Sequence, residues 1–188
     1  MNPKDERKLA NALNKRDWPT AEKILRRKTA KGGSAADFYN LGAVLNEMGR
    51  WRFAITALKR ARKMAPRDEG VLMQLGRAAL AEQDLELAAD AFGAALQVSP
   101  GNRMAKSNFG KLSLRLGDWK TAREVLKDFK EPEMRMLAYR AAAEMGDEAA
   151  RAELDALLAE PRSRAAAVSA MAKTGRGRIP LNPPPAAD

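Results

Sequence analysis

Residues 38–68 read FYNLGAVLNEMGRWRFAITALKRARKMAPRD, and a closely similar stretch returns twice further along the chain. The second copy, LMQLGRAALAEQDLELAADAFGAALQVSPGN, occupies residues 72–102, and the third, KSNFGKLSLRLGDWKTAREVLKDF, occupies residues 106–129. Similarity at a constant spacing is typical of repeat proteins, in which each unit buries its apolar face against its neighbours. The sequence therefore predicts a stack of similar units, with its function on the surface that the stack presents.

Small and apolar residues fix the register of the copies. Three series keep a step of 34 residues: Gly42, Gly76 and Gly110; Ala54, Ala88 and Ala122; Leu58, Phe92 and Leu126. Within each copy the apolar positions recur every three or four residues, which is the periodicity of a helix and not of a strand. We therefore expect two helices in each unit, with a turn at Gly49-Arg50 and a helix end before Pro66 in the first copy.

The composition argues against an enzyme. The chain has 188 residues with no cysteine and no histidine, so disulfides, thiolate metal sites and the commonest general base are all excluded. No phosphate-binding loop or dinucleotide fingerprint is present. The acidic residues Asp84, Glu86, Asp147 and Glu148 lie in predicted turns, where helix N-capping explains them. We expect a non-catalytic protein with no cofactor and no metal.

The start of the chain gives no targeting signal. Residues 1–18 lack the apolar centre of a signal peptide. No later stretch approaches the roughly 18 apolar residues that a membrane span requires. We therefore expect a cytoplasmic protein with no membrane partner.

The formal net charge of +10 is distributed in blocks of alternating sign. The blocks carry +6 in residues 1–34, +4 in 35–68, −4 in 69–102, +5 in 103–130, −3 in 131–164 and +2 in 165–188. A polyanion such as DNA would cross the acidic blocks, which weakens a general nucleic-acid function.

The repeat pattern resembles that of the tetratricopeptide repeat family. The first copy matches the signature positions of that family at Leu41, Gly42, Leu45, Ala54, Leu58, Ala61 and Pro66, and the second copy matches them equally well. In the third copy Ser113 and Phe129 depart from the pattern. The resemblance implies an all-α protein, a right-handed superhelical solenoid of antiparallel helix pairs with about four to five units.

The resemblance also suggests the boundaries of the units. We expect a degenerate first unit over 2–34, repeats over 35–68 and 69–102, a shortened repeat over 103–130, a degenerate unit over 131–162, a capping helix over 163–174 and a proline-rich disordered tail over 175–188. The shortening is visible in the alanine series, because Ala122 and Ala150 are only 28 residues apart. This loss of six residues, around residues 127–134, must tighten the second helix of the third repeat.

In this family the first helices of the units line a concave groove that binds a segment of a partner protein. The resemblance assigns three carboxamides to this groove, Asn40, Gln74 and Asn108, which would pair with the backbone of an extended segment. It assigns four cations, Arg77, Lys111, Arg115 and Arg135, which would meet acidic side chains or a free C-terminal carboxylate. Tyr39, Met73 and Tyr139 would add apolar contacts. The alternative is a solvated polar face without a ligand.

We therefore expect an interaction scaffold or adaptor whose partner is a protein. The clamp that chaperone-binding members use for acidic C-terminal peptides is absent, since only Asn108 fits its positions. Nucleic-acid binding, especially RNA binding, is the alternative. It would use the basic N-terminal and third units, and Arg26, Arg27 and Lys28 would contribute to it. Trp18, Trp51 and Trp119 occupy equivalent positions, which favours packing within each unit over base stacking. A small-molecule ligand is not expected.

Overall fold

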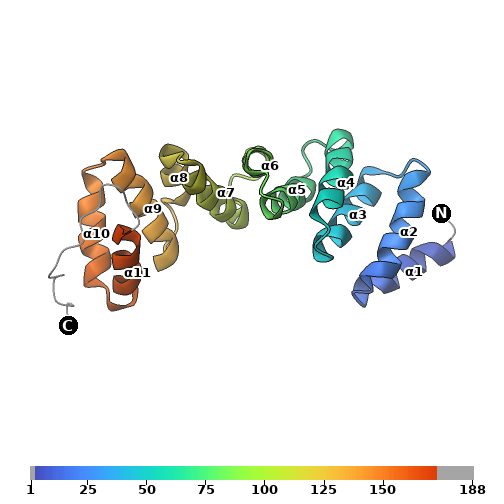
Figure 1. Ribbon diagram of the computed structural model, residues 1–188, viewed down its shortest axis with the longest axis horizontal. Helices are drawn as coiled ribbons and strands as arrows, with labels where there is room; N and C mark the ends of the chain where they lie inside the picture. The colour runs from blue at the N-terminus through green and yellow to red at the C-terminus, as the bar shows by residue number, and fades with distance from the viewer. Residues whose placement is uncertain (1–2, 173–188) are drawn as a thin grey trace. The chain divides into compact units, whose positions relative to one another are not determined.

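The computed structural model describes residues 3–172, which form eleven α-helices and contain no β-strand (Figure 1). The helices are α1 (Pro3–Asn14), α2 (Trp18–Ala30), α3 (Ala35–Glu47), α4 (Trp51–Met64), α5 (Glu69–Ala81), α6 (Leu85–Val98), α7 (Arg103–Leu116), α8 (Trp119–Leu126), α9 (Pro132–Met145), α10 (Ala149–Ala159) and α11 (Pro161–Ala172). The all-α prediction is confirmed. The predicted tail over 175–188 lies outside the described residues.

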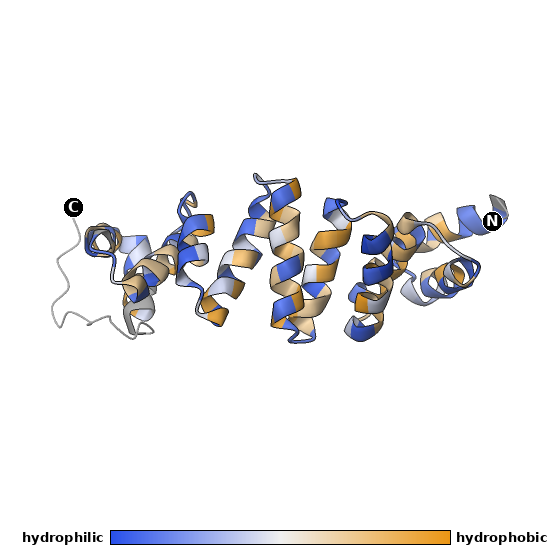
Figure 2. Cartoon of the chain, turned by 90° about the horizontal axis from the view of Figure 1, so that it is seen from above, coloured by the Kyte–Doolittle hydropathy of each residue, from blue (hydrophilic) through white to orange (hydrophobic). Residues whose placement is uncertain are grey.

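The chain divides into two compact units, Met1–Ala105 and Lys106–Asp188. In the first unit the helices pack as successive pairs, α1 with α2, α3 with α4 and α5 with α6, and α3 also contacts α5. In the second unit α9 packs against α8, α10 and α11. Figure 2 shows apolar and polar residues side by side on most helices, as amphipathic helices require.

The glycine series marks the places where two helices approach most closely. A Cβ atom added to Gly76 would lie 2.6 Å from the ring of Phe92, and one added to Gly110 would lie 2.5 Å from Leu126. Gly42 faces Leu58 in the same way. These contacts confirm the register that the sequence predicts, because no larger residue fits at these positions without moving its neighbour.

Aspartate side chains begin four of the helices. Asp17, Asp68, Asp84 and Asp118 each accept a hydrogen bond from the backbone N–H three residues later. The capping prediction is therefore confirmed for Asp84. It is wrong for Glu148, which precedes α10 but makes no capping hydrogen bond with its side chain. Its longer side chain suits this position less well than aspartate.

The shortened repeat appears in the structure as a short helix. Helix α8 has 8 residues, whereas α4 and α6 have 14 each. Gly49, with φ of 69°, forms the predicted turn between α3 and α4. Helix α11 begins at Pro161, earlier than the predicted position 163, and its Ala167 packs in a cluster with Leu157 and Leu158 of α10.

No helix within residues 3–172 combines the length and the apolar character that crossing a bilayer would require.

Candidate functional site

Five of the predicted groove residues come together in the first unit. Tyr39 and Asn40 lie on α3, and Met73, Gln74 and Arg77 lie on α5, which contacts α3. We call these five residues the α3–α5 strip. The two helices are close at this point, since a Cβ added to Gly70 would lie 3.4 Å from the Tyr39 ring. Arg77 is exposed and the other four side chains are half-buried, so the strip offers polar and apolar groups to the solvent.

Asn46, which was not among the predicted groove residues, holds the side chain of Gln74 in place. Asn46 is only 1% exposed, and its Nδ2 donates to the Gln74 backbone oxygen at 3.0 Å and to the Gln74 Oε1 at 2.9 Å. The predicted role of Gln74 as both donor and acceptor therefore needs correction, because its side-chain oxygen is already occupied. Its amide N–H groups donate to no other described residue. The signal in the sequence was an asparagine on an otherwise apolar face of a helix.

Arg77 is not an isolated charge. Its Nη2 lies 3.4 Å from the Glu47 carboxylate, and the two side chains are 44% and 45% exposed. Its Nη1 also lies 3.4 Å from Gln74 Oε1. An exposed ion pair of this kind contributes about 0–1 kcal/mol. The Arg77–Glu47 pair therefore adds little to stability, and both side chains remain in contact with solvent.

The other predicted residues lie in the second unit and differ in their accessibility. Asn108 is half-buried on α7, and Lys111 and Arg115 are exposed on the same helix. Arg135 on α9 makes an ion pair of 3.1 Å with Glu160. Tyr139 is only 4% exposed, so its predicted role as a surface contact is corrected to a core position.

Tyr139 is buried because of the helices that follow it. It packs in one cluster with Leu157 and Leu158 of α10 and Ala167 of α11. Burial raises the pKa of its phenol, because the ionised form loses hydration.

The second unit also contains a pocket of about 720 Å³ that the sequence analysis did not foresee. Its lining residues are Lys111, Leu114, Arg115, Leu116, Gly117, Trp119, Leu137 and Arg140. The Arg140 guanidinium lies 5.8 Å from the centroid of the Trp119 ring. Arg140 was not predicted, because the groove positions of the family include its neighbour Tyr139 and not Arg140 itself.

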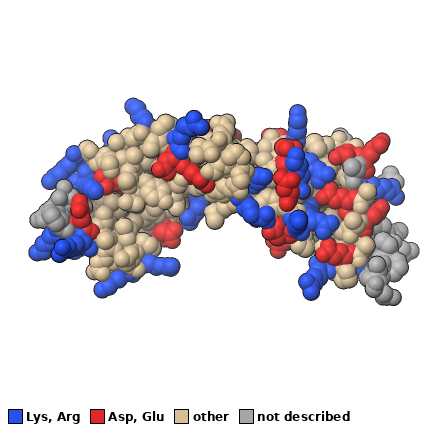
Figure 3. Space-filling model, turned by 180° about the vertical axis from the view of Figure 1, so that it is seen from behind, with Lys and Arg blue, Asp and Glu red and all other residues tan. Residues whose placement is uncertain are grey.

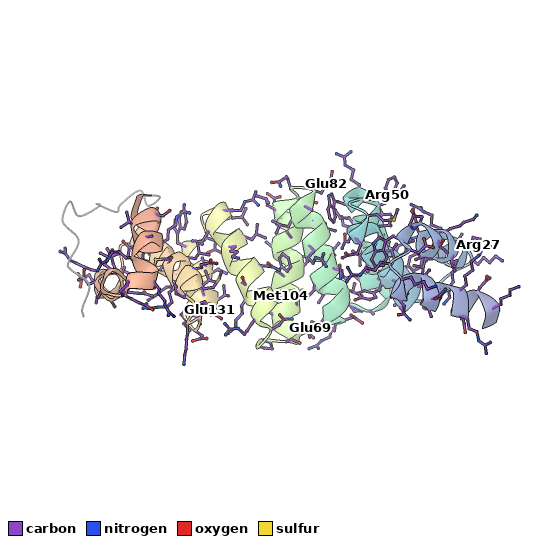
Figure 4. The ribbon with its side chains drawn as sticks, turned by 90° about the horizontal axis from the view of Figure 1, so that it is seen from below. Arg27, Arg50, Glu69, Glu82, Met104 and Glu131 are labelled. Atoms are coloured by element: carbon purple, nitrogen blue, oxygen red, sulfur yellow. The ribbon has the colours of Figure 1, made fainter. Side chains whose placement is uncertain are left out.

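The basic run near the N-terminus is neutralised by acidic neighbours. Arg26 lies 2.7 Å from Glu22, Arg27 lies 3.8 Å from Asp5, and Lys28 lies 2.5 Å from Asp37. Figure 3 shows acidic side chains next to basic ones over much of the face in view, and Figure 4 shows Arg27 on α2 and Arg50 at the start of α4. The pairing weakens the argument for nucleic-acid binding at this run, since phosphates would have to displace these carboxylates.

Comparison with known proteins identifies the family. The model of the tetratricopeptide repeat matches residues 39–103 and 73–133, and together these segments cover just over half of the 188 residues. The chain belongs to the tetratricopeptide repeat family. Domains of this family are generally protein–protein interaction modules and non-catalytic scaffolds. Within the part of the chain that the structure describes, no three histidine, cysteine or acidic residues gather as metal ligands would.

Several solved structures share the fold. One crystal structure of MamA has a TM-score of 0.71 and 16% identity, covering 94% of this chain and 96% of that one. The MamA AMB-1 structure has a TM-score of 0.70 and 19% identity, covering 79% and 84%. The TPR domain of Arabidopsis OM64 has a TM-score of 0.54 and 21% identity, covering 57% and 90%. No curated protein sequence gives a significant match. These identities establish similarity of fold.

Proposed function

We propose that this protein is a non-catalytic scaffold that binds an extended segment of a partner protein on the α3–α5 strip. The observation that carries the proposal is the pairing of Asn46 with Gln74. Because buried Asn46 holds the Gln74 oxygen, the Gln74 amide N–H groups are oriented in advance for a main-chain carbonyl of the ligand. Such preorganisation lowers the entropy lost on binding.

The rest of the strip suits the same ligand. Asn40 offers a second carboxamide on the neighbouring helix, and Tyr39 and Met73 supply apolar surface beside it. Arg77 would exchange its exposed pair with Glu47 for an acidic side chain or a free C-terminal carboxylate of the partner. Recognition of the backbone by carboxamides requires no particular sequence, so Arg77 would select for charge.

The second unit carries side chains of the same kind by itself. Asn108 offers a carboxamide, and Lys111 and Arg115 offer exposed cationic side chains on one helix. Arg135 and Tyr139 are left out of the proposal. Arg135 is paired with Glu160 at the end of α10, and Tyr139 is buried.

The experiment begins with affinity capture of the partner and its identification by mass spectrometry. A labelled segment of that partner is then titrated against the wild type, Gln74→Leu and Arg77→Ala by fluorescence polarisation. Loss of a charge-assisted hydrogen bond costs about 1.5–3 kcal/mol, so Arg77→Ala should weaken binding about tenfold or more. Arg77→Ala should leave the melting temperature unchanged, because its side chain is exposed. Gln74→Leu should lower it, because buried Asn46 keeps the Gln74 backbone acceptor but loses the Oε1 acceptor.

The matched control is the double variant Lys59→Glu and Lys63→Glu, which changes two exposed residues of α4. It should bind as the wild type does. Should this control abolish binding while the strip variants retain it, the partner uses the second helices of the pairs and the proposed site is wrong.

A further inference from the structure

We infer that the pocket lined by Lys111, Leu114, Arg115, Leu116, Gly117, Trp119, Leu137 and Arg140 is an anchor for an acidic, partly apolar segment of a partner protein. We call it the Trp119 pocket. It would take a carboxylate together with the large apolar side chain next to it. The inference rests on the proposed function, because it assumes that the ligand is a protein segment.

The floor of the Trp119 pocket is apolar. Leu114 is buried, Trp119 and Leu137 are half-buried, and Leu116 is 43% exposed at the edge. An exposed leucine beside a half-buried tryptophan gives a surface that gains from being covered. The volume of about 720 Å³ lies within the range of roughly 300–1,000 Å³ that is usual for ligand sites. The pocket is therefore large enough for a leucine-sized or phenylalanine-sized side chain and an adjacent carboxylate.

The cations of the pocket set it apart from the surface around it. Lys111, Arg115 and Arg140 all line it, and none of the lining residues that the structure describes is acidic. Elsewhere in this unit acidic side chains lie beside the cations, as in Lys106–Asp128, Arg123–Glu153, Lys127–Glu124 and Arg135–Glu160. Lys111 and Arg140 beside an apolar floor create a local field that favours a negative group.

Arg140 provides an independent indication of a ligand. Its guanidinium lies over the Trp119 ring at 5.8 Å, while its Nε is buried and has no hydrogen-bond acceptor among the described residues. Buried donors in folded proteins are almost always satisfied, so this donor needs an explanation. A carboxylate oxygen that enters the pocket would supply the acceptor.

The geometry favours a protein segment over a nucleic acid. Nucleic acids bind through several phosphates spread along a strip of cations. Here the cations form one cluster, whereas Arg123 and Lys127 on the adjoining helix α8 are paired with Glu153 and Glu124. One cluster with an apolar floor matches a single carboxylate and its apolar neighbour.

The test uses the indole N–H resonances of the full-length protein labelled with ¹⁵N. Trp18, Trp51 and Trp119 give three such signals, each assigned with a Trp→Phe variant. The probe is a peptide with blocked ends and the sequence Leu-Glu-Phe-Asp-Leu-Glu, and its partner probe replaces the acids with Gln and Asn. The acidic peptide should shift the Trp119 signal saturably and leave the other two in place. The amide peptide should bind at least tenfold more weakly.

Two variants and a control complete the test. Lys111→Ala and Arg140→Gln should each weaken the titration at least tenfold, and Lys111 is exposed, so its removal does not threaten folding. Lys120→Ala is the control, because Lys120 is an exposed cation next to Trp119 in sequence that does not line the pocket. It should titrate as the wild type does.

Several outcomes would overturn the inference. These are a Trp119 signal that stays fixed at millimolar acidic peptide, an equal response to both peptides, or a response to oligodeoxythymidylate alone. If the Trp119 signal does not shift but partner binding still depends on Gln74 and Arg77, the pocket is rejected and the proposed function is retained. If the Trp119 signal shifts but substitution of Gln74 and Arg77 does not change partner binding, the pocket is supported and the α3–α5 strip is rejected.

Discussion

The close contact between α5 and α6 at Gly76 predicts opposite effects of Gly76→Ala in two backgrounds. The substitution should destabilise the protein when Phe92 is present and stabilise it when Phe92 is replaced by alanine. In Gly76→Ala the new Cβ would lie 2.6–2.8 Å from three atoms of the Phe92 ring. Phe92 is 0% exposed, so its ring cannot turn toward solvent to relieve the clash. Overpacking of this kind costs about 1–3 kcal/mol. The higher helix propensity of alanine offsets about 1 kcal/mol of this destabilisation. The wild-type background should therefore lose up to about 2 kcal/mol.

Replacing Phe92 with alanine should abolish this loss of stability. In a Phe92→Ala background the same Gly76→Ala change meets no ring, so only the helix preference remains and it should stabilise by up to about 1 kcal/mol. The assay is urea denaturation followed by circular dichroism at 222 nm, with all four members of the cycle compared. Gly101→Ala is the control, since nothing lies within 4 Å of its added Cβ. Equal effects of Gly76→Ala in both backgrounds would refute the close-packing argument and the register with it.

Two further predictions concern buried polar residues in the first unit. Asn46→Ala should lower the free energy of unfolding by about 1–3 kcal/mol in urea denaturation, because both of its hydrogen bonds to Gln74 are lost; an unchanged midpoint would show that the pair contributes nothing. Burial would raise the pKa of Asp37, but hydrogen bonds from Lys28 and Ser34 outweigh it and lower the pKa. Its contribution to stability is therefore present above about pH 4 and lost as the pH falls further. Asp37→Asn should destabilise at pH 7 and have little effect near pH 2, and an equal effect at both would contradict this.

The sequence was sufficient for the helix pairs because their packing depends on small residues at fixed spacing. Gly76 could be interpreted from the sequence alone. A glycine that recurs in a helix every 34 residues indicates that a second helix packs closely against it. The same alignment located the loss of residues around 127–134, directly after the short helix α8. These features belong to single units and to the contact between their two helices.

The sequence was insufficient where a residue's surroundings come from another part of the chain. Tyr139 occupies a groove position in the alignment, yet α10 and α11 bury it, because α9 packs against both. The alignment treated Gln74 as a surface amide, and Asn46, 28 residues earlier, occupies its oxygen. Arg140 was overlooked because its contact is with Trp119 of the preceding helix pair. For Gln74 and Arg140 the deciding partner lies in the preceding repeat unit, and for Tyr139 part of the cover comes from α11, after the last unit.

The alternating charge of the chain has a physical explanation in the contacts between successive helix pairs. Ion pairs at steps of 28 or 30 residues join neighbouring pairs of helices: Glu22 with Arg50, Glu47 with Arg77, Arg52 with Glu82, Arg62 with Asp90 and Arg123 with Glu153. Most of these side chains are at least partly exposed, so each pair contributes only about 0–1 kcal/mol and the apolar core supplies the stability. Their value lies in specificity, because sliding one helix pair along its neighbour would oppose like charges. It follows that the net charge of +10 is a poor guide to partners, because several of the cations, Arg77 among them, already lie next to an acidic side chain of a neighbouring helix pair.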